Sequence, residues 1–173
     1  MKKLLLVLCV LALSAGLLFG LNTVQASLFF RLHLTGYEIL WDQVEEDYDA
    51  RFVLVESGDT LTVAVYQKSP LGWRYLISNS GENYAVTALS LYSQAQKETL
   101  LAKPRNFCMV AATKEKLEDT YAQMDQSSSD AFVAYDTETF KSDTVLLFGY
   151  SDEEFGSEDL IAAAMPLDAD TQP

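Results

Sequence analysis

The N-terminal sequence says more than any other feature about where this chain folds. The sequence begins Met-Lys-Lys and then runs without a charge from Leu4 to Leu21. Lysines ahead of an apolar helix stay on the cytoplasmic side while the helix enters the bilayer. We therefore predict that residues 1–26 are a signal peptide or a membrane anchor. The remaining residues are expected to fold outside the cytoplasm.

The apolar run leaves cleavage and retention both open. Its 18 residues are long for a signal peptide and just reach the range of about 17–25 that spans a bilayer. Val24 and Ala26 are the small residues that a cut after Ala26 needs. Residues 27–32 continue an apolar face with no proline or glycine, which favours retention. The sequence predicts either a secreted domain or a domain held in the membrane by Leu4 to Leu21.

The exported part is strongly acidic. Two of the 12 basic residues precede the apolar run, which leaves ten against 25 acids and a formal charge of −15 over 147 residues. Nucleic acid and anionic lipid bind mainly through lysine and arginine, so we exclude nucleic acid as a partner. The chain is 49% hydrophobic and can bury a core, so one folded domain is expected. Its partner would be an unknown protein or a cell-envelope ligand.

Cysteine usage points to a bacterial cell surface. Cys108 is the one cysteine of the exported part, so no internal disulfide can form there. Its apolar neighbours indicate an inert core thiol rather than a nucleophile. The sequence also contains no Asn-x-Ser/Thr glycosylation site, unlike many eukaryotic ectodomains.

Residues 52–81 carry the clearest strand pattern. Two β-rich runs, 52–56 and 60–66, flank the turn Ser57-Gly58-Asp59 and predict a hairpin. A second turn at 69–72 leads to a strand over 73–77, which residues 78–81 are expected to end. Further strands are predicted over residues 84–92, 107–112 and 131–135. Residues 93–103 are predicted to form either a short helix or a loop. The first three strands, 52–56, 60–66 and 73–77, predict an antiparallel meander.

Residues 113–124 predict a helix, because Leu117, Tyr121 and Met124 have helical spacing and Thr113 can cap the first turn. A competing interpretation comes from an internal match. Residues 145–159 repeat the order of residues 107–119 at an offset of 38 to 40. If this repeat is real, the domain consists of duplicated hairpin units, and residues 113–124 belong to a hairpin.

The predicted fold class is α+β, mainly antiparallel β in hairpin units, with one or two short helices after the N-terminal apolar helix. Five acids between Asp42 and Asp49 indicate a solvated turn. The expected organisation is residues 1–26 as signal or anchor, 27–49 as a juxtamembrane segment and acidic linker, 50–165 as the β-rich domain, and 166–173 as a flexible acidic tail.

The sequence predicts no catalytic, cofactor-binding or metal-binding residues. His33 is the only histidine, so a Ser-His or Cys-His pair would have to form around it, and its apolar neighbours favour a packed role. One histidine and one exported cysteine cannot complete a zinc site. The acidic clusters at 42–49 and 152–159 lack the alternating ligands of a calcium loop.

Aromatic residues are the remaining indication of function. Trp73 and Tyr75 alternate on one face of a predicted strand and, with Tyr66, are candidates for a ligand face, although core packing explains the same pattern. We therefore predict a binding or accessory domain at the bacterial cell surface. The alternative is an envelope-polymer hydrolase with a carboxylate pair. A cleft holding two carboxylates would favour the hydrolase, and an aromatic face would favour the binding domain.

Overall fold

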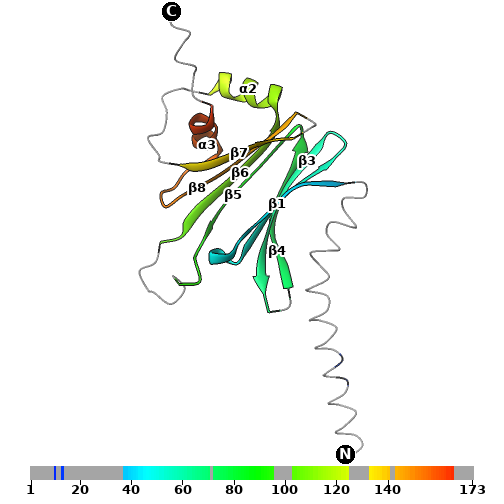
Figure 1. Ribbon diagram of the computed structural model, residues 1–173, viewed down its shortest axis with the longest axis vertical. Coiled ribbons are helices and arrows are strands. Elements are labelled where there is room, and N and C mark those ends of the chain that lie inside the picture. Colours follow the sequence, from blue (N-terminus) through cyan, green and yellow to red (C-terminus); the bar gives the residue numbers. More distant parts are fainter. Residues whose placement is uncertain are drawn as a thin grey trace, which may run out of the picture.

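The structure is a computed structural model that describes residues 10, 13, 37–70, 72–95, 103–124, 133–140 and 143–165. These residues form a mainly antiparallel β fold with two short α-helices, as predicted (Figure 1). The predicted tail 166–173 and nearly all of residues 1–36 lie outside the described part. The elements are β1 (Glu38–Glu45), the 3-10 helix η1 (Glu46–Tyr48), β2 (Ala50–Ser57), β3 (Thr60–Ser69), β4 (Gly72–Glu82), β5 (Tyr84–Leu91), β6 (Arg105–Thr113), α2 (Lys114–Gln123), β7 (Ala134–Thr139), β8 (Thr144–Ser151) and α3 (Ser157–Ala164).

The strands form two four-stranded antiparallel sheets that pack face to face. Sheet A has the order β1-β2-β3-β4 and sheet B the order β5-β6-β8-β7. The chain passes from one sheet to the other at Asn83, whose φ of 58° is left-handed. Gly81 is required at this crossing, because a Cβ there would lie 2.2 Å from the carbonyl oxygen of Tyr84.

The sandwich interior is filled by alternate residues of both sheets. Phe52 of sheet A packs on Phe107 and Phe148 of sheet B, with ring centroids 5.3 and 4.9 Å apart. Trp41 of β1 joins this cluster at 5.2 Å from Phe148. Offset and tilted ring pairs of this kind stabilise a core beyond the area that they bury.

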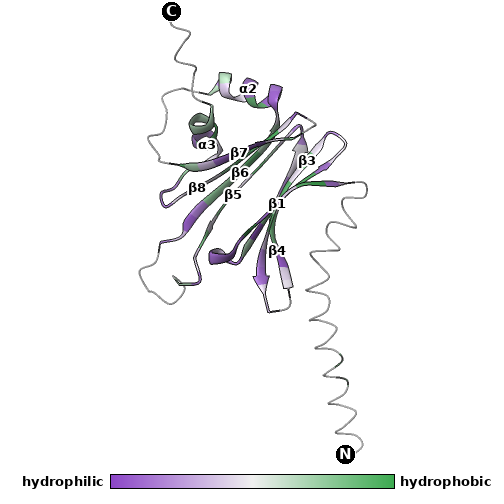
Figure 2. Ribbon diagram, viewed as in Figure 1, coloured by the Kyte–Doolittle hydropathy of each residue, from purple (hydrophilic) through white to green (hydrophobic). Residues whose placement is uncertain are grey.

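The outer face of sheet B is covered by both helices (Figure 1). Leu117 of α2 and Leu160 and Ile161 of α3 are 3%, 0% and 1% exposed on a sheet whose strand β6 is apolar along most of its length (Figure 2). Gly149 allows this approach, because a Cβ there would lie 2.5 Å from Leu160 Cδ1. The central strands β6 and β8 of sheet B are therefore buried on both faces.

The hairpin and helix predictions are confirmed. Strands β2 and β3 pair in an antiparallel hairpin whose last pair is Ser57 opposite Thr60. The turn between them contains Gly58, whose φ is 60°. Helix α2 fills the interior of the predicted segment 113–124, which is therefore not a hairpin, and the N-cap Thr113 accepts a hydrogen bond on Oγ1 from the Lys116 backbone N–H at 3.4 Å. The segments linked by the offset of 38 to 40 are strand–helix units, β6–α2 and β8–α3, so this match does not join two hairpins. Helix α3 was not predicted.

The prediction of a turn or linker over residues 42–49 is wrong. Asp42 and Glu45 belong to β1, which pairs with β2, and η1 follows. The described fold therefore begins before Ala50. An edge strand tolerates acids that point to solvent, and the register shift between Ile39 and Trp41 hides the alternation that would reveal a strand.

Strand β4 is longer than predicted. Residues 78–81 were expected to end it, yet Ser78 and Ser80 continue the ladder opposite Ala64 and Thr62. Thr62 Oγ1 and Ser80 Oγ are 2.8 Å apart and hydrogen-bonded. Polar pairing of this kind stabilises an edge strand that hydropathy alone does not reveal. Strand β7 spans Ala134–Thr139 and so continues past the predicted end at Tyr135, while residues 131–132 of the predicted strand lie outside the described residues.

In the described part of the chain, no helix combines the length and apolar character needed to cross a bilayer.

Candidate functional site

The three predicted ligand-face residues come together on the outer face of sheet A. Phe52 and Val65 point into the sandwich, so their neighbours on β2 and β3 point outward. In the β3–β4 ladder, Tyr66 lies opposite Tyr75 and Lys68 opposite Trp73. The Tyr66 and Tyr75 rings meet edge to face, with centroids 6.1 Å apart. We call Tyr66, Trp73, Tyr75 and the neighbouring Arg51 the aromatic patch.

The members of the aromatic patch differ in accessibility. Tyr66 is 1% exposed and forms its floor, and burial raises the pKa of the Tyr66 phenol. Trp73 and Tyr75 lie on edge strand β4 and are only partly buried. The hydroxyls of Tyr75 and Ser78 are 3.1 Å apart and hydrogen-bonded. Core packing therefore accounts for Tyr66, whereas Trp73 and Tyr75 keep surface for another molecule.

Arg51 adds an oriented cation to the patch. Its guanidinium carbon lies 6.0 Å from the centroid of the Trp73 ring, in cation–π geometry. Asp42 holds it from β1: Arg51 Nε donates to Asp42 Oδ1 at 2.8 Å, and Nη2 donates to Oδ2. This hydrogen bonding raises the pKa of Arg51. A two-point ion pair fixes the plane of the guanidinium beside the indole.

Sequence reasoning missed Arg51 and Asp42. The register of the predicted hairpin contains the signal for Arg51, because pairing that starts at Ser57–Thr60 places Arg51 opposite Tyr66. Asp42 gave no such signal, because its segment was predicted to be a linker.

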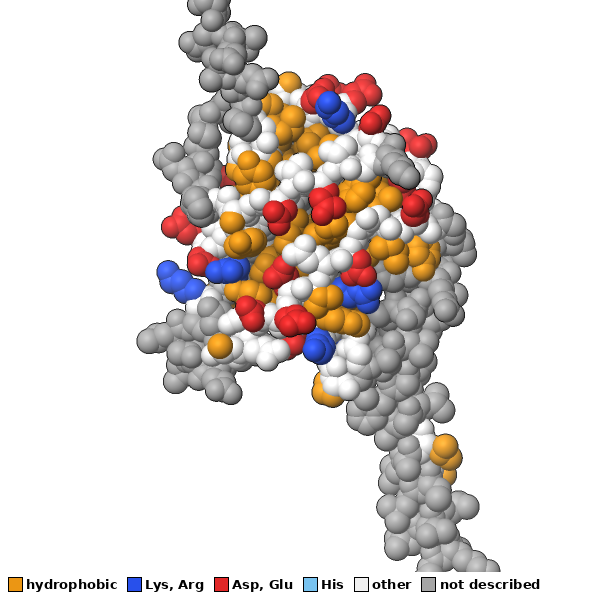
Figure 3. Space-filling view, viewed as in Figure 1, with side chains coloured by type: hydrophobic (Ala, Val, Ile, Leu, Met, Phe, Trp, Pro, Cys, Tyr) orange, Lys and Arg blue, Asp and Glu red, His pale blue; other side chains and the backbone are white. Residues whose placement is uncertain are grey.

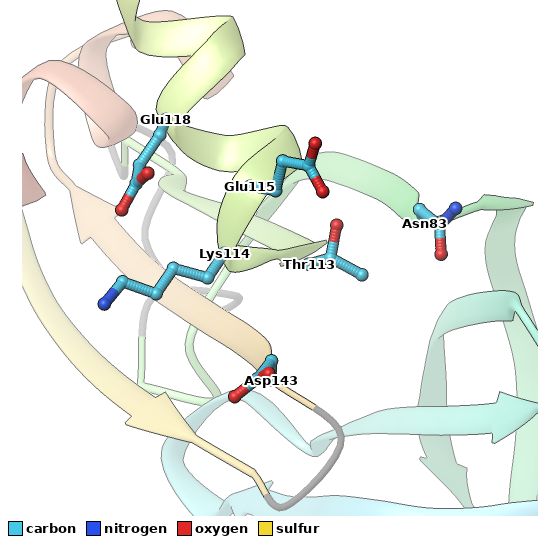
Figure 4. A pocket seen from close by; sticks show the side chains of 6 residues that line it. All are labelled: Asn83, Thr113, Lys114, Glu115, Glu118 and Asp143. Carbon is cyan, nitrogen blue, oxygen red and sulfur yellow. The ribbon is translucent and has the colours of Figure 1, made fainter.

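A polar hollow lies at the end of the sandwich where α2 begins. The residues that line it are Asn83, Thr113, Lys114, Glu115, Glu118 and Asp143 (Figure 4). Backbone hydrogen bonds tie its loops together, from Thr113 N–H to Asn83 O at 3.1 Å and from Lys114 N–H to Asp143 O at 2.9 Å. In Figure 4, Lys114 and Glu118 extend to one side of α2 and Glu115 to the other. This end is polar and mostly acidic.

The carboxylates do not gather as metal ligands. Over the residues that the structure describes, no three Asp, Glu, His or Cys side chains converge to hold a metal ion. Acids are instead spread over the visible face of the molecule (Figure 3). Such a surface repels polyanions.

At the opposite end, Arg105 forms a packing cluster. Its guanidinium carbon lies 5.7 Å from the Tyr48 ring and 5.1 Å from the Tyr150 ring, and Nε donates to Asp152 Oδ1 at 2.9 Å. This hydrogen bond raises the pKa of Arg105. The arrangement ties η1 to β6 and to the end of β8.

Of the two residues that could take part in nucleophilic chemistry, Cys108 and His33, the structure describes only Cys108. Cys108 is fully buried beneath the helices of sheet B, and burial raises the pKa of its thiol to about 12, as an inert core cysteine requires. His33 lies outside the described residues.

Comparisons with protein-family models, with curated proteins and with solved structures find no match for this chain.

Proposed function

We propose that this chain is a small binding domain of the bacterial cell surface, secreted or held in the membrane by Leu4 to Leu21, and that it binds its ligand on the aromatic patch. The observation that carries the proposal is the placement of Arg51. Asp42 holds its guanidinium beside the indole of Trp73, next to Tyr75. Partly exposed aromatic rings with one fixed donor supply the apolar surface and the directional contacts that a binding site needs.

The ligand class that fits best is the uncharged sugar ring of an envelope polymer. The indole and phenol faces offer apolar surface to the C–H side of a sugar ring, and the Arg51–Asp42 pair offers donors and acceptors to its hydroxyls. The formal charge of −13 on the chain disfavours polyanionic ligands.

The patch is also rigidly built, which favours binding. Tyr75 and Trp73 lie opposite Tyr66 and Lys68 in the β3–β4 ladder, next to the register shift between Val65 and Tyr66, and Tyr66 supports them from below. Groups held by a sheet lose little conformational freedom when a ligand arrives.

The test is co-sedimentation of the purified protein with insoluble cell-wall glycan from a bacterial envelope. Trp73→Ala is expected to weaken binding at least about tenfold, because aromatic anchors carry most of the energy of such sites. Tyr135→Ala is the matched control, since Tyr135 is an aromatic residue 41% exposed on β7 of the other sheet. This control is expected to bind like the parent.

Three results would overturn the proposal. The parent protein could fail to sediment with the glycan, or the Trp73 and Tyr135 variants could lose binding equally. Release of soluble sugar fragments by the parent would instead indicate the hydrolase. Circular dichroism of each variant checks that the sheets are intact.

A further inference from the structure

A second hollow lies at the opposite end of the sandwich, beside Arg105. Its lining comes from η1, the end of β3, the chain that follows β5 and the start of β6. The lining residues with rings, charges or amide groups are Glu46, Asp47, Tyr48, Lys68, Gln94 and Arg105. We call this site the Arg105 hollow.

Hydrogen bonds tie the walls of the Arg105 hollow together. The Gln94 backbone N–H donates to Asp47 O at 2.9 Å, and Gln94 Nε2 donates to Asp49 Oδ1 at 2.7 Å. The Lys68 backbone N–H donates to Asp49 O, also at 2.7 Å. These bonds join η1, β3 and the chain after β5. The hollow is therefore formed without a ligand, which lowers the cost of binding one.

The balance of charge distinguishes the Arg105 hollow from the rest of the molecule. Its basic lining residues are Lys68 and Arg105, and its acidic lining residues are Glu46 and Asp47. The whole chain has 12 basic against 25 acidic residues, and the hollow beside α2 has one base, Lys114, against three acids. Cations and anions around one hollow suit a ligand that carries both a carboxylate and an ammonium group.

Arg105 is held in an orientation that suits a carboxylate. Its guanidinium carbon lies 5.7 Å from the ring of Tyr48, which is 7% exposed and lines the same hollow. The bond to Asp152 uses Nε. The two Nη nitrogens, which this bond does not use, offer parallel donors of the kind with which arginine binds carboxylates.

Lys68 connects the Arg105 hollow to the aromatic patch. It lies opposite Trp73 in the β3–β4 ladder and also lines the hollow. It follows Tyr66 by two residues on β3, so the two side chains point to the same face of sheet A. A ligand on Trp73 therefore lies next to the hollow.

We propose that the Arg105 hollow binds a short peptide branch of the glycan whose sugar ring lies on the aromatic patch, an inference that rests on the proposed function. The carboxylate of such a branch pairs with Arg105 and Lys68, and an ammonium group on it pairs with Glu46 or Asp47. A branch with both charges is not repelled by the acidic surface in the way that a polyanion is.

The test compares two forms of one insoluble envelope glycan, the first with its peptides and the second after an amidase has removed them. The full chain is expected to co-sediment at least about tenfold more tightly with the first form, because two linked contacts bind more tightly than one. Lys68→Met removes one charge and is expected to reduce this ratio of affinities at least about fivefold. Lys116→Met, at an exposed lysine of α2, is the matched control and is expected to keep the ratio of the parent.

A second measurement uses the released peptides alone, so that it needs no sugar. Isothermal titration calorimetry is expected to detect their binding to the full chain. Amidation of their terminal carboxyl groups is expected to weaken this binding at least about tenfold, because the charge-assisted hydrogen bonds to Arg105 and Lys68 are lost.

The outcomes separate this proposal from the binding function. Equal binding of the two glycan forms, no binding of the free peptides, or peptide binding that amidation leaves unchanged would overturn the peptide site and leave the sugar site in place. Equal ratios for Lys68→Met and Lys116→Met would also overturn it. Peptide binding without co-sedimentation of either glycan form would instead overturn the proposed function and keep the hollow as a peptide site.

Discussion

The two outer faces of the sandwich are both buried along their central strands, but α2 and α3 lie on only one of them. On sheet B, Cys108 and Val110 are fully buried beneath α2 and α3. On sheet A, Val53 and Val55 are buried to the same degree on a face that neither helix covers. Central strands that are apolar at consecutive positions must be buried on both sides. The comparison teaches that the central strands of both sheets are buried on both sides, although the two described α-helices lie on sheet B alone.

The largest expected effect concerns the helical cover. Leu160→Ala removes the side chain of α3 that packs against Gly149, and we expect the free energy of unfolding to fall by about 2–5 kcal/mol because a cavity is left. Urea denaturation measures it. Glu158→Ala, at an exposed position of the same helix, is the control and is expected to change little. A small loss for Leu160→Ala would mean that α3 contributes little as a cover.

A matched pair of valines compares the two faces directly. Val55 and Val110 are both 0% exposed, one on each outer face. Val55→Ala and Val110→Ala are each expected to cost about 1–3 kcal/mol, because both remove two buried carbon atoms. If Val55→Ala is nearly neutral in urea denaturation while Val110→Ala is costly, the outer face of sheet A is not packed like that of sheet B.

The dependence of stability on alkaline pH compares one buried titratable group from each outer face, the Cys108 thiol and the Tyr66 phenol. Burial raises the pKa of Cys108 from 9.0 to about 12 and raises that of Tyr66. Between pH 9 and 12 the unfolded chain has lost the thiol proton that the folded chain retains. The free energy of unfolding therefore falls as the pH rises, by about 1.4 kcal/mol per pH unit, and the full contribution is present below pH 9.

Urea denaturation from pH 7 to 11 checks this dependence. Cys108→Ala is expected to flatten the decline that begins near pH 9, and Tyr66→Phe the decline above pH 10. A decline that both variants retain unchanged would assign the alkaline sensitivity to other groups.

The smallest expected effect is the ion pair of the aromatic patch. Asp42 and Arg51 have side chains about one-third exposed, so their coupling is expected to contribute less than about 1 kcal/mol to stability. A double-mutant cycle of Asp42→Asn and Arg51→Gln measures it, and 1 M salt should reduce it further. A coupling above about 2 kcal/mol would contradict this role and would make the ion pair a structural link between β1 and β2.

Local signals in the sequence were enough for the β2–β3 hairpin and for helix α2. The turn at Gly58 and the β-rich runs on each side predicted the β2–β3 hairpin, and the cap at Thr113 predicted α2. The local sequence did not predict the strand β1, because the position of a strand in the sheet can outweigh its composition. β1 is acidic yet is a strand, because an edge position leaves its carboxylates in water.

The candidate site was predicted in part for the same reason. Trp73 and Tyr75 share a face by strand alternation, and the structure brings Tyr66 beside them. The contribution of Asp42 depends on the pairing of β1 with β2, which hydropathy did not indicate.

The sequence by itself determined the antiparallel hairpin, the capped helix and the alternation that groups the aromatic residues, because these depend on neighbours within a few positions. Only the tertiary structure decided which strands form each sheet, that α2 and α3 both cover sheet B, and that Asp42 orients Arg51 beside Trp73. Those arrangements depend on burial of apolar surface between segments far apart in the chain, and no local pattern encodes which distant faces will meet.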